Sequence, residues 1–156
     1  MLRFNLSRPH AGWAQATVSD NSEKLTVSAS YTPIDAIRHF VDAVASLKSM
    51  ASAHCCWFQE PGEMHWQFLR SKDIVSIEVI RFPGVRMLGR HGPDGVSVFK
   101  AKMQWVEFAK QVLGSMHNKM RNSVGIDGYN REWRHAFPQE ACEKLDTAIR
   151  QAERLD

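Results

Sequence analysis

The alternation of apolar and polar residues between residues 53 and 82 predicts three consecutive β-strands joined by two tight turns. In Glu63–Leu69, every second side chain is apolar, which is the period of a strand with one buried face. The run Ile74–Phe82 carries apolar side chains on both faces and predicts an interior strand. Pro61-Gly62 is the strongest turn signal, because Pro presets φ and Gly accepts a positive φ. These strands are expected at the centre of a sheet.

Weaker patterns on either side extend the expected sheet. Trp13–Asp20 and Lys24–Tyr31 are rich in Thr, Val, Ser and Ala, and a polar cluster separates them. This predicts a hairpin at a sheet edge, where side chains need not be fully buried. Val96–Met103 predicts one further strand. The segment Pro83–Gly95 holds four glycines and two prolines and predicts a long loop.

Apolar residues at spacings of three and four predict helices elsewhere. The first begins at Thr32 and Pro33, a capping residue and a proline suited to the first helical position, and runs to about Met50. A second runs from Gln104 to near Gly125, and a last one starts at Pro138. The aromatic residues of the intervening segment recur every four positions and predict a short helical turn against the core: Tyr129, Trp133 and Phe137.

The resulting element order, ββαββββαα, predicts an α+β fold. An antiparallel sheet of about six strands would carry the helices on one face. A chain of 156 residues fits a single domain, residues 1–156, which can bury a sizeable core. The sequence contains neither a run of 18 apolar residues nor a secretory signal at its start, so we expect a soluble cytoplasmic protein without a membrane partner.

Few residues carry obvious chemistry. Of the three cysteines, Cys55 and Cys56 are adjacent and fit reduced thiols better than a disulfide framework. With His54 and His65 they could face one another across a hairpin, as a Cys–His nucleophile or a metal site would require. Adjacent strand residues point to opposite faces, however, so both thiols cannot bind one ion. We therefore expect no metal, no cofactor and no catalytic cluster.

Charged residues give a second set of candidates. Glu60 and Glu63 flank the Pro-Gly turn and are expected to be solvated at an exposed tip, where no pocket would shift their pKa. The net charge is only +3, so attraction of nucleic acid would need a local patch. The sequence lacks an aromatic RNA-binding strand and a helix-turn-helix pattern, which makes nucleic acid an unfavoured partner. The residues that could form a basic strip are Arg81, Arg86, Arg90, His91, Lys100 and Lys102.

The run W-F-x-E-P-G-E-x-H-W-x-F, from Trp57 to Phe68, is followed by the strand Ile74–Phe82 and later by G-Y-x-x-x-W…F-P, from Gly128 to Pro138. With these motifs, most of the chain after Thr32 resembles a group of small bacterial proteins. Some proteins of this build resemble immunity proteins that accompany polymorphic or contact-dependent growth inhibition toxins. The resemblance implies a protein that covers a toxin and performs no chemistry. One departure is charge, since inhibitors of nucleases are often acidic and this chain is slightly basic.

The combined prediction is a non-enzymatic protein-binding module, an immunity protein that neutralises a cognate toxin by steric occlusion. The residues expected at the interface are Glu60, Glu63, His65, Gln67, Arg86, Arg90 and His91. Two alternatives stay open. A nucleic-acid-binding regulator would show salt-sensitive binding, and a small enzyme using Cys55 or Cys56 would need an accessible and partly ionised thiol.

Overall fold

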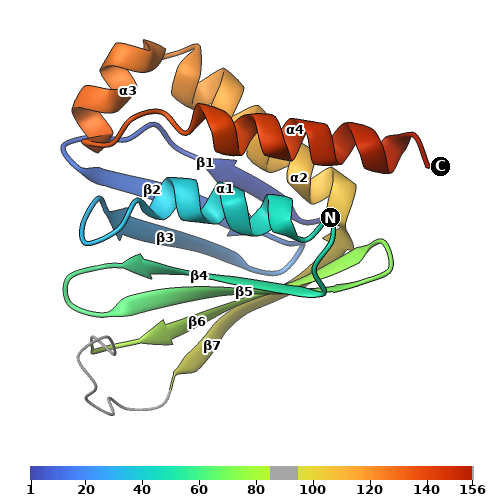
Figure 1. Ribbon diagram of the computed structural model, residues 1–156. Helices are drawn as coiled ribbons and strands as arrows, with labels where there is room; N and C mark the ends of the chain where they lie inside the picture. Colours follow the sequence, from blue (N-terminus) through green and yellow to red (C-terminus); the bar gives the residue numbers. More distant parts are fainter. Residues whose placement is uncertain (85–94, 156) are drawn as a thin grey trace.

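The computed structural model describes residues 1–84 and 95–155, and this part of the chain forms an α+β fold (Figure 1). Its strands build two antiparallel sheets, one of three strands and one of four. The helices all lie on the same side of the sheets (Figure 1). The predicted fold class and the placement of the helices on one face are therefore confirmed.

The first sheet contains β1 (Arg3–Leu6), β2 (Trp13–Ser19) and β3 (Lys24–Ser30), in that order. The predicted hairpin is confirmed, with Trp13 opposite Ser30. Its predicted edge position holds only for β3, because β1 pairs with the other side of β2. Strand β1 was not predicted, since four residues are too few to establish a period.

The second sheet contains β4 (Ser52–Phe58), β5 (Glu63–Ser71), β6 (Ile74–Phe82) and β7 (Val96–Gln104), again in chain order. The three central strands and the following one are confirmed. As predicted, β6 is an interior strand, because it pairs with both β5 and β7. Gly62 has a φ of 97°, which explains the glycine in the turn before β5.

The prediction of one sheet with about six strands is wrong. The two sheets lie side by side with β3 next to β4 (Figure 1), and no backbone ladder joins these strands in the described chain. Side chains make contacts at this boundary. Ser30 Oγ donates to Glu60 Oε1 over 3.2 Å, and Gln59 Nε2 donates to the Ser28 carbonyl over 3.4 Å. Side-chain hydrogen bonds of this kind do not change the alternation of apolar and polar residues. The sequence pattern therefore could not show that the strands belong to two sheets.

The helices follow the predicted pattern with shifted ends. Helix α1 (Ala36–Ser46) is capped by Asp35, whose carboxylate accepts the N–H of Arg38 over 3.2 Å, and not by Thr32. The second predicted helix is α2 followed by a π-helical segment, and the aromatic segment falls mostly within α3. The remaining segments are α2 (Trp105–Gly114), η1 (Ser115–Arg121), α3 (Gly125–Trp133) and α4 (Gln139–Glu153).

The core is centred on Phe40 of α1, which is fully buried against the inner face of both sheets. Its ring stacks on Phe4 of β1 with centroids 5.1 Å apart and meets Trp66 of β5 edge-on at 4.9 Å. Aromatic rings bury roughly 150–250 Å² each, which makes them the main source of core stability. The inner sheet face is thus fully used by packing, and the opposite, outer face is where a site can be built.

Candidate functional site

Strand pairing aligns the polar residues of β4, β5 and β6 in rows across the outer face. Cys56 lies opposite His65, and His54 lies opposite Gln67. Gln67 in turn lies opposite Glu78. Because residues two apart share a face of a strand, Glu63, His65 and Gln67 all point outward from β5. Register alone therefore places a thiol, a carboxylate and an imidazole next to one another.

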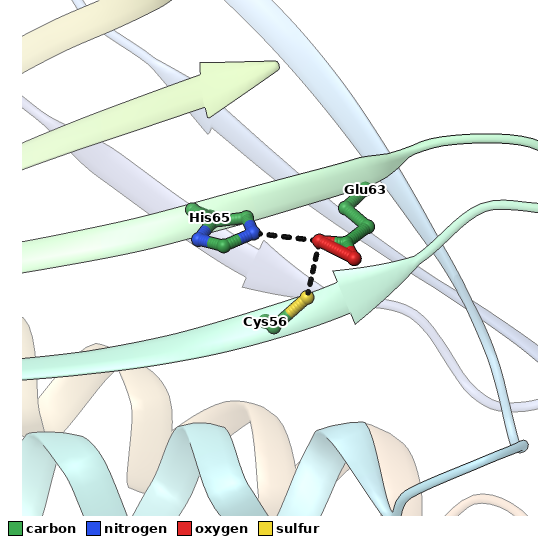
Figure 2. Close-up of side chains that lie close together, drawn as sticks. All are labelled: Cys56, Glu63 and His65. Atoms are coloured by element: carbon green, nitrogen blue, oxygen red, sulfur yellow. Dashed lines mark hydrogen bonds and ion pairs between the residues drawn. The ribbon is translucent and has the colours of Figure 1, made fainter. Parts of the chain in front are cut away.

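These three side chains form one cluster (Figure 2). The Glu63 carboxylate is its centre. His65 Nε2 lies 2.9 Å from Glu63 Oε2, and the Cys56 thiol donates to the same oxygen over 3.6 Å. The ligand atoms of the three residues all lie within 4.8 Å of one another.

His54 extends the cluster along β4. Its Nε2 lies 3.0 Å from His65 Nδ1, so the two imidazoles share one hydrogen bond. Partial burial lowers the pKa of His54, and His65 lowers it further, whereas Glu63 acts in the opposite direction. His54 is therefore stabilised in its neutral form, which can accept a hydrogen bond from His65.

Glu63 is buried, with an exposed fraction of 1%. The expectation of a solvated carboxylate at an exposed tip is wrong for this residue. Glu63 lies opposite Phe58 on one side and Phe82 on the other, and both rings are buried. Gly95 packs over the Phe82 ring, because a β-carbon at Gly95 would come within 2.5 Å of it. The acid thus lies between two buried aromatic rings.

The surroundings of Cys56 favour its thiol form. Partial burial, followed by the Glu63 carboxylate and its hydrogen bond, raises the pKa of Cys56 to about 12. A nucleophilic cysteine needs the opposite shift, usually from a neighbouring cation. Cys55 lies on the opposite face of the strand and points into the core, and burial also raises its pKa. This arrangement gives neither thiol the environment of an activated nucleophile.

A second region of the outer face is open. The side chains around Gln67 and Glu78 border a hollow of about 320 Å³ between β5 and β7. Leu69 is 62% exposed at its edge, and Lys100 forms an ion pair with Glu78 over 3.5 Å. Lys102 is exposed beside it. The face therefore offers an apolar residue and two cations around a shallow depression.

The structure places the predicted site residues in different surroundings. His65 belongs to the cluster and is partly exposed, Glu63 is buried within the same cluster, and Gln67 borders the hollow. Glu60 is exposed, but it points to the sheet boundary and accepts from Ser30. The predicted loop residues lie outside the described part of the chain: Arg86, Arg90 and His91.

Sequence reasoning placed His54, Cys56 and His65 on adjacent strands but did not join Glu63 to them. The sequence analysis did not predict the pairing register of the hairpin formed by β4 and β5, which would have revealed this contact. Pairing Phe58 with Glu63 puts Cys56 opposite His65, and the carboxylate then lies diagonally across from the thiol. Lys100 was assigned to a nucleic-acid strip, and the structure places it beside Glu78.

No protein-family model, curated protein or solved structure matches this chain. Within the described residues, no helix combines the length and apolar character that crossing a membrane requires.

Proposed function

We propose that this protein binds another protein through the outer face of its four-stranded sheet, and that the partner is a toxin which it neutralises by occlusion. The observation that carries this proposal is the open region around the hollow, which joins exposed Leu69 to the cations of β7. Apolar centres with polar rims are typical of protein interfaces. The sequence resemblance to immunity proteins supports the choice of a toxin.

The charges of this region indicate the kind of surface that it fits. Lys100 is only partly compensated by Glu78, and its side chain is 70% exposed. Lys102 adds a second exposed cation. Complementary charge steers association and fixes the orientation of partners. We therefore expect an acidic contact surface on the toxin, which fits the slight positive charge of this chain.

A protein fits this face better than a nucleic acid. Recognition of single strands depends on exposed aromatic rings that stack against bases. The phenylalanines that the described part of this sheet directs outward, Phe58 and Phe82, are buried. Two lysines without a stacking platform give little affinity beyond phosphate contacts.

The test is to read the open reading frame upstream of this gene and, where it encodes a large secreted protein, to co-express the carboxy-terminal region of that protein with this chain. The wild-type chain is expected to restore growth and to form a complex of fixed stoichiometry. A double charge reversal, Lys100→Glu with Lys102→Glu, should weaken the complex at least tenfold. The matched control is Lys144→Glu with Arg154→Glu, which changes two exposed cations at α4, on the other side of the molecule.

Equal loss of binding in both double variants would contradict the assignment of the face. Retention of nuclease-sensitive nucleic acid, without a protein partner, would contradict the proposed function itself.

A further inference from the structure

We propose that Cys56, Glu63 and His65 form a Zn²⁺-binding site with an open fourth position on the outer face of β4 and β5. The site does not rest on the proposed toxin-binding role. It differs from the sequence-based expectation of no metal, which considered the two neighbouring thiols together and not one thiol with Glu63.

The donor types fit zinc. Thiolate sulfur, imidazole nitrogen and carboxylate oxygen are the three ligand classes that Zn²⁺ takes in proteins. Tetrahedral coordination places such ligand atoms roughly 3.3–3.7 Å apart, given zinc–ligand bonds of about 2.0–2.3 Å. Here Cys56 Sγ and Glu63 Oε2 are 3.6 Å apart, Glu63 Oε2 and His65 Nε2 are 2.9 Å apart, and the full set fits within 4.8 Å. Small side-chain rotations therefore suffice to enclose the ion.

The protein ligands balance the charge of the ion. Zn²⁺ together with the Cys56 thiolate and the Glu63 carboxylate has no net charge, and His65 binds as a neutral ligand. A neutral site suits this position, because Glu63 is only 1% exposed and burial penalises net charge.

The protons can be followed through binding. The Cys56 thiol releases its proton to solvent as the zinc–sulfur bond forms. His65 gives up its Nε2 proton to solvent and takes the proton of the shared hydrogen bond from His54 Nε2 onto its Nδ1, while His54 Nδ1 takes up one proton from solvent. His65 Nδ1 then donates to His54 Nε2, and these two imidazoles together gain and lose no proton. The net result is one proton released per ion. A hydrogen-bond acceptor behind a metal-binding histidine is the usual supporting arrangement, so His54 is a positioning residue.

The fourth position faces solvent. His65 keeps 16% of its side chain exposed, and Cys56 is half-buried, so the ion would be reached from the outer face. Three protein ligands with an exchangeable water are typical of zinc sites that are not purely structural.

The first experiment uses the full chain after treatment with a chelator. Zn²⁺ affinity is measured by competition with a chromophoric chelator, and Co²⁺ is added separately as a spectroscopic probe. We expect one ion per chain and the near-ultraviolet charge-transfer absorption of a cobalt–thiolate bond. The release of one proton predicts that the apparent Kd falls about tenfold per pH unit between pH 6.5 and 8.

Substitutions test whether Cys56 and His65 bind the ion directly, in comparison with a cysteine and a histidine elsewhere in the protein. Cys56→Ser should abolish the cobalt–thiolate absorption, and His65→Gln should weaken Zn²⁺ binding at least a hundredfold. His54→Phe should weaken binding 10- to 100-fold, because it removes the acceptor behind His65. The controls are Cys142→Ser, a buried thiol of α4, and His10→Gln, an exposed imidazole beside the first sheet, and both should retain wild-type affinity.

A measurement on the wild-type chain guards against variants that fail to fold. Zn²⁺ should protect Cys56 from alkylation under conditions in which the ion leaves the rate at Cys142 unchanged. It should also raise the Tm with increasing concentration. Absence of the cobalt–thiolate absorption in the wild type, or equal protection of the two cysteines, would overturn the proposal. Loss of toxin binding in the Lys100→Glu, Lys102→Glu variant with normal zinc affinity would leave it intact.

Discussion

Glu63 and His65 lie two residues apart on the same face of β5, and Glu63 Oε2 lies 2.9 Å from His65 Nε2. The pair connects a buried acid to a side chain that solvent can still reach. Glu63 therefore contributes to the stability of the sheet as well as to the chemistry of its outer face. This dual position separates Glu63 from Glu60, its exposed neighbour across the turn.

Charge reversal should affect the two glutamates very differently. Glu63→Lys places a cation in the aromatic environment between Phe58 and Phe82, and we expect it to lower the free energy of unfolding by about 3–5 kcal/mol. Glu60→Lys loses one partly buried hydrogen bond from Ser30 and should cost about 1 kcal/mol. Urea denaturation of both variants provides the measurement. If both variants lowered the free energy of unfolding by the same amount, the burial of Glu63 would not contribute to stability.

The lowered pKa of His54 predicts a pH dependence of stability. The unfolded state binds the His54 proton at about pH 6.5, and the folded state binds it only at lower pH. The stabilising contribution is therefore complete above pH 6.5 and is lost as the pH falls from there through the folded pKa. The free energy of unfolding should fall less steeply between pH 7 and 5 in His54→Gln than in the wild type. The same slope in the variant and the wild type would show that His54 does not cause the pH dependence of stability.

The raised pKa values of the cysteines predict slow alkylation of the folded protein. Cys56 and Cys142 each have a pKa of about 12, because burial disfavours their thiolates. At pH 8, iodoacetamide should react with the native chain at least tenfold more slowly than with the urea-unfolded chain. Peptide mapping of the modified sites is the measurement. Rapid native labelling of Cys56 would instead favour the cysteine-enzyme alternative.

The aromatic core predicts a large cost for losing Phe40. Its ring contacts β1, β5 and α2 through Phe4, Trp66 and Phe108. Phe40→Ala should lower the free energy of unfolding by about 3–5 kcal/mol. Leu69→Ala, at a side chain that is 62% exposed, should change it by about 0.5 kcal/mol or less. A small effect at Phe40 would contradict its central role.

Local pattern was sufficient for most of the secondary structure. The strict alternation in Glu63–Leu69 predicted both β5 and its buried face, and Trp66 and Phe68 are in the core as expected. The same period correctly predicted that Cys55 and Cys56 point to opposite faces of their strand. These features depend on neighbours only two residues away, so the sequence specifies them directly.

Helix ends and sheet boundaries depended on distant contacts. Asp35 caps α1 and also accepts from Trp133 Nε1 over 2.8 Å, a partner 98 residues away. The boundary between β3 and β4 depends on side-chain contacts such as Ser30 with Glu60. Residue propensities and hydrophobic spacing cannot predict such contacts, because they depend only on residues close together in the sequence.

The candidate site shows the same division. The amino-acid sequence by itself determined that His65 and Glu63 share one face of β5 and that Cys55 and Cys56 point to opposite faces of β4. Only the tertiary structure decided that Glu63 is buried, because it lies between the buried rings of Phe58 and Phe82 on the two neighbouring strands. Strand period fixes the direction of a side chain, whereas the packing of separate segments fixes its exposure to water. Because it is buried, Glu63 lies at the centre of a cluster with the Cys56 thiol and the His65 imidazole and is not solvated at the tip of the hairpin.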